Sequence, residues 1–345
     1  MASRTPRACA LGVLALQLFA GSSAAQRSSP DSAARRGGAP AGLDALVFER
    51  SRLKPRPAGA AVAGLVGEYG DGRDTVFVLE REGRLYLRDG ERELPLSDVM
   101  FTRDAAGRGA AVRARARTFA RLAVGTEAGV TFRITPLRDV ESLRREALRA
   151  SPPHENGAER PVDLVELVSL EPGVHLDVRY ASANNFLGAP LYSSSRTFLQ
   201  RPAAEALVRV HRALAAYGYG LLVHDAYRPW HVTKMFWDAT PAAQREFVAN
   251  PATGSRHNRG AAVDLTLYDR ETGAPVRMPG GYDEFSHRSY ADYPGGTALE
   301  RWHRDLLRRV MESQGFTVNP AEWWHFDFQG WRGYPLLNIP IEKLR

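Results

Sequence analysis

The amino-acid sequence predicts an α+β protein, in which a small antiparallel β domain is followed by a larger α+β domain with a central antiparallel sheet. Three observations predict this class. Between residues 62 and 134, short runs of alternating apolar and polar residues are typical of half-buried strands. From residue 160 onwards, similar runs alternate with segments of helical periodicity. At 345 residues the chain is long enough for two domains.

The first domain is predicted to comprise residues 61–150 and to be rich in β-strands. Strands are expected at residues 75–80, 84–88, 111–115 and 130–134. The first two are separated by Arg81-Glu82-Gly83, which predicts a hairpin. Residues 139–150 have helical spacing, and residues 151–157 are predicted to be a linker. Arginines at alternate strand positions are interpreted as a solvated face, and binding of polysaccharide or cell wall is the alternative.

The second domain is predicted to comprise residues 160–345. Helices are expected at residues 201–218 and 297–312, and strands at residues 221–224, 262–267 and 323–328. The first helix has Pro202 near its start and Gly218 at its end, as helices prefer. Within the middle strand, alternation directs Asp264 to the face opposite the apolar residues. In the last strand, His325 is expected to share a face with Asp327.

The N-terminal residues 1–25 are predicted to be a secretory signal peptide. Arg4 and Arg7 precede an apolar run at residues 8–20, and Ser23-Ala24-Ala25 offers a cleavage site of small residues. The run is too short for a membrane span, so no stable membrane insertion is expected after cleavage. An uncleaved short anchor is the alternative. Export to the periplasm or the extracellular medium is therefore expected, with residues 26–60 as a flexible linker of Ser, Ala, Arg, Gly and Pro.

Composition excludes several classes of function. The only cysteine, Cys9, lies inside the predicted signal peptide, so the mature chain is expected to have no disulfides, no cysteine zinc ligands and no cysteine nucleophile. The formal net charge is +7, but aromatic residues are not interleaved with a basic stripe. A nucleic-acid partner is therefore not expected. The sequence predicts no oligomeric state.

Two segments of the second domain contain residue types that bind metals. The pattern S-x-H-x-x-G-x-A-x-D runs from Ser255 to Asp264, and E-W-W-H runs from Glu322 to His325. A catalytic zinc takes three protein ligands and leaves a fourth position for water or substrate. The three ligands predicted for one Zn²⁺ per chain, on the sheet surface, are His257, Asp264 and His325.

Each of these three residues also has a structural explanation. His257 is alternatively an exposed loop histidine, Asp264 a buried carboxylate paired with an arginine, and His325 a core imidazole with a satisfied hydrogen bond.

Two histidines and one carboxylate also bind iron in non-haem oxygenases. There the first histidine and the carboxylate usually lie two residues apart on a jelly-roll strand. Here they are seven apart with no barrel pattern around them, which disfavours iron.

Two further residues are candidates for the chemistry itself. Glu322 lies three residues before His325, and a continuous strand would direct the two to opposite faces. Glu322 is therefore expected in the turn after Asn319-Pro320, where it can take a proton from the water on the zinc. Arg228, held between a strand end and a proline, is the candidate for stabilising a tetrahedral intermediate. Its structural alternative is a salt bridge with Asp225.

Together with D-x-Y-R-P at residues 225–229, the two segments resemble, in this order, the zinc D-alanyl-D-alanine dipeptidases of the VanX type. The resemblance extends from about residue 174 to the C-terminus. It implies zinc-dependent hydrolysis of D-Ala-D-Ala or a similar wall-derived dipeptide, with Glu322 as base and Arg228 stabilising the intermediate. It also implies substrate contacts at Ser255 and Asp283. Of these, Asp283 suits the ammonium group of the substrate and Ser255 its carboxylate end.

Two other functions remain open. Related zinc peptidases act on peptidoglycan stem peptides as carboxypeptidases or endopeptidases; predicted export favours that function, whereas the closer motif match favours the dipeptidase. The other alternative is a zinc-stabilised binding module without catalysis. The presence of Glu322 and Arg228 argues against it, because a purely structural zinc needs neither residue.

Overall fold

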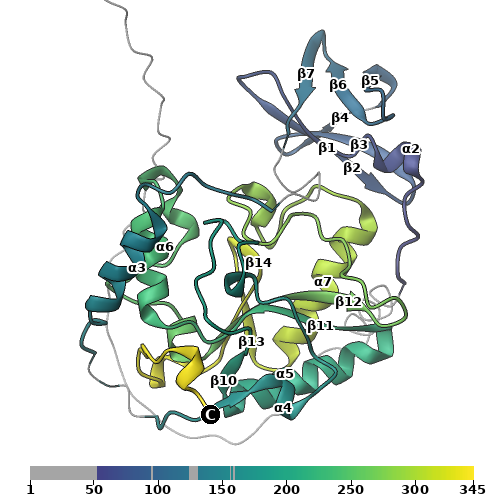
Figure 1. The fold of residues 1–345 in the computed structure, drawn as a ribbon. Coiled ribbons are helices and arrows are strands. Elements are labelled where there is room, and N and C mark those ends of the chain that lie inside the picture. The colour runs from purple at the N-terminus through teal and green to yellow at the C-terminus, as the bar shows by residue number, and fades with distance from the viewer. Residues whose placement is uncertain (1–52, 95, 124–130, 156, 158–159) are drawn as a thin grey trace, which may run out of the picture. The chain divides into compact units, whose positions relative to one another are not determined.

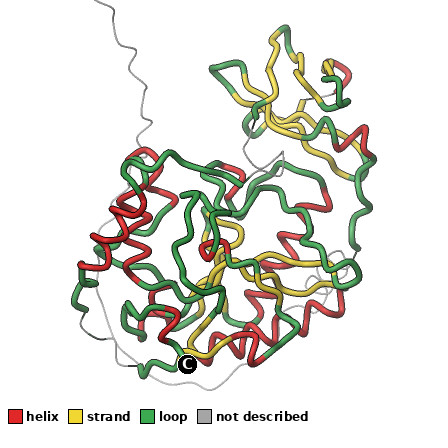
Figure 2. Tube along the Cα trace, in the orientation of Figure 1, coloured by secondary structure: helices red, strands yellow, loops and turns green. Residues whose placement is uncertain are grey.

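The computed structural model describes residues 53–94, 96–123, 131–155, 157 and 160–345 (Figure 1). The predicted signal peptide and most of the predicted flexible linker lie outside these residues, so export stays a prediction. Within the described residues the protein is of mixed α+β class, as the sequence predicts (Figure 2). No helix in this part of the chain is long and apolar enough to span a membrane.

Residues 67–121 form a seven-stranded antiparallel sheet with the strand order β4-β3-β2-β1-β7-β6-β5. Its strands are β1 Gly67–Gly70, β2 Thr75–Arg81, β3 Arg84–Asp89, β4 Arg92–Leu94, β5 Val99–Arg103, β6 Gly109–Ala114 and β7 Arg117–Arg121. The predicted hairpin is confirmed as β2 and β3. Its two turn residues, Glu82 and Gly83, both have positive φ, which matches the twist of the flanking strands. One hydrophobic cluster, which includes Tyr69 and Val112, packs within this sheet.

The strand predicted at residues 130–134 is wrong for the part that the structure describes, residues 131–134. Ile134 donates its backbone N–H to the carbonyl of Phe186, in a loop of the second half of the chain. The side chains of Phe132 and Ile134 pack against the large hydrophobic core there. Alternating apolar residues therefore anchor an extended segment to that core, without a neighbouring strand. The sequence analysis also missed β1, β4, β5 and β7, which are short or have few inward apolar residues.

The second sheet has five strands in the order β13-β14-β12-β11-β9. Its strands are β9 His175–Leu176, β11 Tyr219–Asp225, β12 Ala262–Asp269, β13 Phe316–Asn319 and β14 Glu322–Phe328. All neighbours are antiparallel except β9, which pairs in parallel with β11 at the edge. The predicted central antiparallel sheet is thus present, with one parallel edge strand. A separate two-stranded sheet joins β8 Leu164–Glu166 to β10 Phe198–Gln200.

Helices surround the second sheet (Figure 1). The α-helices of the described residues are α2 Ala60–Ala63, α3 Val140–Arg149, α4 Leu167–Leu170, α5 Arg201–Leu214, α6 Trp230–Ala239 and α7 Ala298–Ser313. Asp139 caps α3 through the N–H of Ser142, and Thr297 forms a capping box with Glu300 at the start of α7. A 3-10 turn at Ala215–Tyr217 follows α5, and Gly218 ends it in the left-handed conformation.

The predicted helices are therefore confirmed, and α2, α4 and α6 were missed. Helix α6 is buried on most of its surface, so its sequence has no polar face to reveal the helical period. Short 3-10 helices occur at Leu96–Asp98, Arg179–Ala181, Ala215–Tyr217, Ala242–Phe247, His257–Arg259, His287–Ser289, Trp331–Gly333 and Ile341–Lys343.

Strand β12 separates the core from the candidate site. Val263, Leu265 and Leu267 are completely buried in the large hydrophobic cluster that includes residues of α5 and α7. Because side chains alternate along a strand, Asp264 and Thr266 point to the other face of the sheet. The same alternation buries Trp324, Phe326 and Phe328 in β14 and turns His325 towards Asp264. The polar residues of both strands therefore meet on one face.

Candidate metal centre

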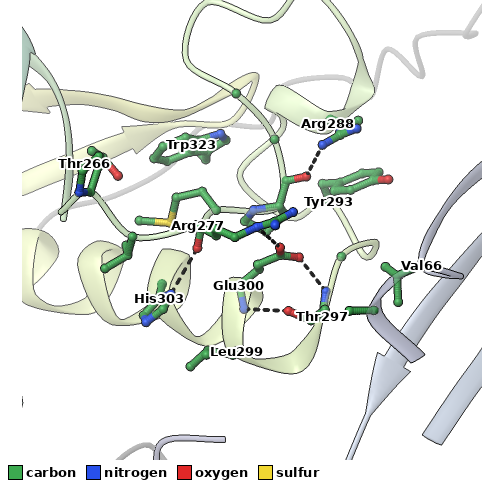
Figure 3. A pocket seen from close by; sticks show the side chains of 18 of the residues that line it. Val66, Thr266, Arg277, Arg288, Tyr293, Thr297, Leu299, Glu300, His303 and Trp323 are labelled. Atoms are coloured by element: carbon green, nitrogen blue, oxygen red, sulfur yellow. Dashed lines mark hydrogen bonds and ion pairs between the residues drawn. The ribbon is translucent and has the colours of Figure 1, made fainter. Parts of the chain in front are cut away.

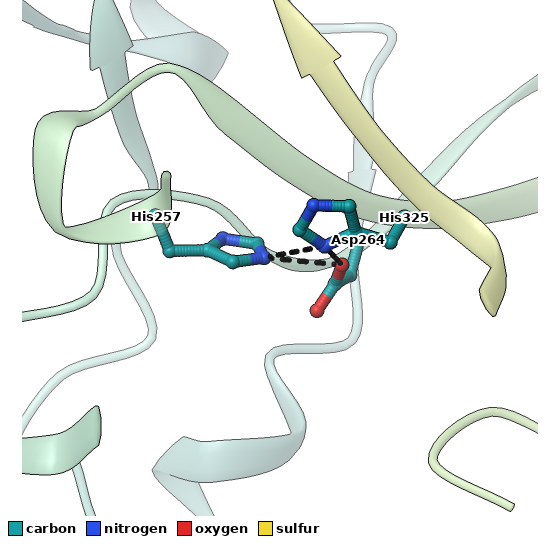
Figure 4. Close-up of side chains that lie close together, drawn as sticks. All are labelled: His257, Asp264 and His325. Atoms are coloured by element: carbon teal, nitrogen blue, oxygen red, sulfur yellow. Dashed lines mark hydrogen bonds and ion pairs between the residues drawn. The ribbon is translucent and has the colours of Figure 1, made fainter. Parts of the chain in front are cut away.

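His257, Asp264 and His325 converge on one point, although 68 residues separate the first from the last (Figure 4). Asp264 and His325 are direct cross-strand partners in β12 and β14. His257 begins the 3-10 turn His257–Arg259, and Gly260, in a left-handed conformation, leads the chain from this turn into β12. The reversal places His257 Nε2 3.0 Å from His325 Nδ1 and 3.2 Å from Asp264 Oδ1. His325 Nδ1 lies 3.0 Å from the same oxygen.

Each imidazole directs its second ring nitrogen towards this point. The carbonyl of Ala226 can only accept, so His257 donates to it through Nδ1, at 2.6 Å. Similarly, His325 donates through Nε2 to Asp327 Oδ1 at 2.9 Å. His257 Nε2, His325 Nδ1 and an Asp264 oxygen, all of which can bind a metal, therefore face one another. All three residues are buried, so their mutual repulsion requires a proton or a cation between them.

The pKa values agree with strong electrostatic coupling at this point. Burial lowers the pKa of His325, but hydrogen bonds with Asp264 and Asp327 outweigh burial and raise that pKa to about 10. Burial raises the pKa of Asp264, yet His257 and His325 hold it well below its usual range. A metal ion that binds here must displace the proton from His325, so binding releases protons at neutral pH.

The donor set and its spacing fit zinc. Two ligands bound to one tetrahedral zinc at about 2.0–2.2 Å lie roughly 3.3–3.6 Å apart. The donor atoms of the three residues are 3.0–3.2 Å apart and need to move outward only slightly. Two imidazoles and one carboxylate are also the ligand set of catalytic rather than structural zinc. His257, Asp264 and His325 are therefore the residues that would hold the ion.

Glu322 lies beside the three ligands at the first position of β14. Its Oε2 is 3.7 Å from His325 Nδ1 and accepts a hydrogen bond from the Asn319 side chain at 2.9 Å. The pairing of β13 with β14 shifts register between Val318 and Asn319. Because of this irregularity, Glu322 reaches the same side of the sheet as His325 despite their separation of three residues. Burial raises the pKa of the Glu322 carboxyl above its usual range.

Arg228 reaches the ligands from the end of β11. Its Nε and Nη2 bind Asp225 Oδ2 at 2.9 and 2.8 Å, so the salt bridge considered as a structural alternative is present. Its Nη2 also lies 3.5 Å from Asp264 Oδ2. Asp225 in turn accepts a hydrogen bond from the Tyr192 hydroxyl at 2.8 Å. The guanidinium is therefore held rigidly beside the ligands, and it packs over the ring of Phe236.

Asp283 is a buried carboxylate in a loop, with φ of 54° and 7% exposure. The hydroxyl of Tyr180 donates to its Oδ2 at 2.8 Å, and the Tyr180 ring lies against the Arg228 guanidinium. Burial raises the pKa of Asp283 well above its usual range. Within the described residues no arginine, lysine or histidine forms an ion pair with it. Burial without a cation therefore destabilises the ionised form of this carboxyl.

Ser255 is also buried, but its hydroxyl serves the loop of the first ligand. Its Oγ accepts the backbone N–H of His257 at 3.2 Å, and its own N–H donates to Asn258 Oδ1 at 2.8 Å. The structure thus brings Glu322 and Arg228 to the predicted ligands. Ser255 contacts the loop of His257. Asp283 is connected to Arg228 through Tyr180.

The sequence analysis missed three hydroxyl groups around the centre. Tyr180 and Tyr192 bind the carboxylates of Asp283 and Asp225, and the Tyr282 hydroxyl donates to Asp264 Oδ2 at 3.2 Å. All three come from loops or 3-10 turns without hydrophobic periodicity, so no local pattern indicated them. For Asp327 a pattern did exist, namely its position two residues after a predicted ligand on the same strand face.

A cavity of about 840 Å³ is lined in part by residues of β12 and β14 (Figure 3). Its lining includes Thr266, two residues after Asp264 in β12, and Trp323, two residues before His325 in β14. Residues two apart on a strand face are about 6.6–6.8 Å apart, so the cavity begins one strand position from the ligands. Tyr282 lines this side of it. Thr266 Oγ1 and Trp323 Nε1 are buried and have no hydrogen-bond partner among the described residues.

A family profile described as D-Ala-D-Ala dipeptidase matches residues 160–336. The D-alanyl-D-alanine dipeptidase of Escherichia coli (strain K12) is 37% identical over 175 residues, which cover 51% of this chain and 89% of that protein. The enzyme of the same name from Enterococcus faecium is 35% identical over 172 residues, or 45% of this chain and 85% of its own.

A third relative and one solved structure also match. The D-alanyl-D-alanine dipeptidase of Streptomyces coelicolor is 35% identical over 182 residues, covering 47% of this chain and 87% of that protein. Among solved structures, the LdcB LD-carboxypeptidase is 18% identical with a TM-score of 0.30, over 51% of this chain and 72% of that chain.

Proposed function

Because the chain belongs to the D-alanyl-D-alanine dipeptidase family, we propose that it is a zinc peptidase that hydrolyses D-alanyl-D-alanine or a similar wall-derived dipeptide. One observation carries the proposal. Three buried donor atoms from His257, Asp264 and His325 lie 3.0–3.2 Å apart, with the carboxylate of Glu322 beside them. A structural zinc is usually closed by four protein ligands, whereas three ligands leave a position for a reactant.

In the proposed reaction, different side chains of the protein transfer the proton and stabilise the negative charge. Zinc, when bound, polarises a carbonyl group and makes water acidic enough to attack at neutral pH. Glu322 accepts the proton of the attacking water and then gives it to the nitrogen of the leaving amine as the C–N bond breaks. Arg228 donates N–H groups to the oxygen that becomes negative in the tetrahedral intermediate. Asp225 and Tyr192 keep the guanidinium in place for this task.

The ends of the substrate have separate partners in this proposal. The buried carboxylate of Asp283 pairs with the substrate's free ammonium, which supplies the cation it lacks. Ser255 remains the proposed partner at the carboxylate end. Since its hydroxyl already accepts the N–H of His257, it is available to the substrate as a donor.

A zinc carboxypeptidase or endopeptidase on peptidoglycan stem peptides is the second candidate, and the cavity favours it. Its volume of about 840 Å³ is in the range of about 300–1,000 Å³ that holds drug-sized ligands, and its lining reaches Thr266 and Trp323, so part of a longer peptide has room there. Predicted export of the chain favours the same candidate. We further propose that the sheet at residues 67–121, which precedes the matched family region, is an accessory module of the peptidase.

Purified protein is expected to contain about one zinc per chain, and His325→Ala is expected to lose it or bind it far more weakly. The reason is that the variant removes one of three donors and leaves two. Metal content per chain after dialysis is the measurement. His287→Ala, which changes an exposed histidine, is the matched control and should keep its zinc. Stoichiometric zinc in His325→Ala would contradict the assignment of the ligands.

Replacing Arg228 is expected to reduce kcat more than it changes KM, because its contact strengthens as negative charge develops on the substrate. Arg228→Ala also leaves the fully buried Asp225 without its cation, which costs about 3–5 kcal/mol of stability. Arg228→Lys keeps the charge but loses the planar fork, so it separates chemistry from folding. Kinetics and thermal unfolding are measured together, with Arg308→Ala at an exposed pair as control. An unchanged kcat in a folded Arg228→Lys variant would contradict the role.

A further inference from the structure

Asp327 contacts His325 on the side that faces away from the other ligands. It lies two residues after His325 in β14, and its Oδ1 accepts the Nε2–H of the imidazole at 2.9 Å. Its strand neighbours on either side are Ala262 and Thr317, which leave the carboxylate partly open to solvent. The Asp327 side chain is 19% exposed, so its charge loses less solvation free energy than that of a fully buried carboxylate.

The other oxygen of Asp327 faces the loop of the first ligand. Arg256 Nε lies 3.4 Å from Asp327 Oδ2, and Arg256 directly precedes His257. The Arg256 guanidinium also packs over the ring of Trp331, 4.9 Å from its centre. A single carboxylate therefore connects the strand that carries His325 with the loop that carries His257.

We propose that Asp327 is a positioning residue that orients His325 for the metal, and that Arg256 ties this pair to the loop of His257. The inference rests on the proposed zinc site. Hydrogen bonding at Nε2 fixes the orientation of the ring, so Nδ1 is the nitrogen that faces Asp264 and the metal position. A carboxylate acceptor also makes the opposite nitrogen a stronger donor to a metal, and loss of such a partner typically weakens metal affinity by about 10–100-fold. An exposed ion pair that does not orient a metal ligand contributes little to the stability of the fold.

The test is the zinc dissociation constant of the full chain, measured by competition with a chromophoric chelator at neutral pH. Asp327→Ala is expected to weaken zinc binding by about 10–100-fold. Asp327→Asn keeps an oxygen that accepts from Nε2 but removes the charge, so a smaller loss is expected. Arg256→Ala, which removes only the tie to the loop, is expected to have the smallest effect of the three. Asp305→Ala, at another aspartate–arginine pair, is the matched control and should bind zinc as tightly as the wild type.

Thermal unfolding in excess chelator separates positioning from folding. All variants are expected to unfold within a few degrees of the wild type without zinc, because the proposed effect acts through the metal. If Asp327→Ala fails to fold, the near-isosteric Asp327→Asn decides. Wild-type zinc affinity in the folded Asp327 variants would overturn the inference and leave the zinc site in place. Absence of zinc binding in the wild-type chain would overturn the zinc site itself, and the inference with it.

Discussion

Replacing Glu322 with glutamine is expected to reduce kcat by about 10²–10⁴-fold while zinc stays bound. Glutamine preserves the shape of the side chain, and its carbonyl oxygen still accepts from the Asn319 amide that now binds Glu322 at 2.9 Å. It has no basic group, however, so it does not take the proton of the attacking water. The measurements are kcat and KM on D-Ala-D-Ala and zinc content per chain. Glu312→Gln, at an exposed glutamate of α7, is the matched control.

The pH dependence of the wild-type enzyme should follow from the same residue. Burial raises the pKa of Glu322, and the base acts only when ionised. Activity is therefore expected to fall as the pH decreases through this raised pKa, on the acid side of the profile. The acid limb attributed to Glu322 should be absent from the residual activity of Glu322→Gln. Near wild-type turnover in the variant would show that another group is the base.

Free D-Ala-D-Ala is expected to be hydrolysed at least hundreds of times more efficiently than N-acetyl-D-Ala-D-Ala or a stem pentapeptide. Acylation of the amine removes the cation that we assign to Asp283, a buried carboxylate without an ion pair among the described residues. Removing one partner of a buried charged pair costs about 3–5 kcal/mol. The measurement is kcat/KM for each substrate under identical conditions.

The Asp283→Asn variant tests whether that carboxylate causes the preference. It is expected to reduce kcat/KM for the free dipeptide more than for the capped one, which narrows the gap between them. Asp163→Asn, at an exposed pair with Arg201, is the matched control and should leave the ratio unchanged. Equal or better cleavage of the capped or longer substrate by the wild-type chain would favour the carboxypeptidase or endopeptidase instead. The cavity beside the ligands would then hold the rest of the peptide.

Much of the second half of the chain was predictable because its signals are local. The strand at β12 alternates regularly, so the inward direction of Val263 and the opposite direction of Asp264 follow from the sequence. Proline near the start and glycine after the end identified α5, and the motif order predicted membership of the dipeptidase family, which the family profile confirms. The residue types in the segments at residues 255–264 and 322–325 similarly indicated a metal site.

Other features depend on contacts between distant residues, and only the tertiary structure decided them. Whether an alternating segment becomes a strand depends on a partner strand, and for residues 131–134 the chain provides a loop instead. Glu322 reaches the ligands because the β13–β14 pairing is irregular at Asn319.

By itself, the sequence determined the family, the order of the main elements of the second half and the residue types at the metal centre, since each follows from short-range pattern. The tertiary structure decided which side chains surround the centre. Tyr192 holds Asp225, and Tyr180 binds Asp283. Tyr192 and Tyr180 act across 33 and 103 residues of chain, and a hydrogen bond over such a separation leaves no periodic trace in the sequence.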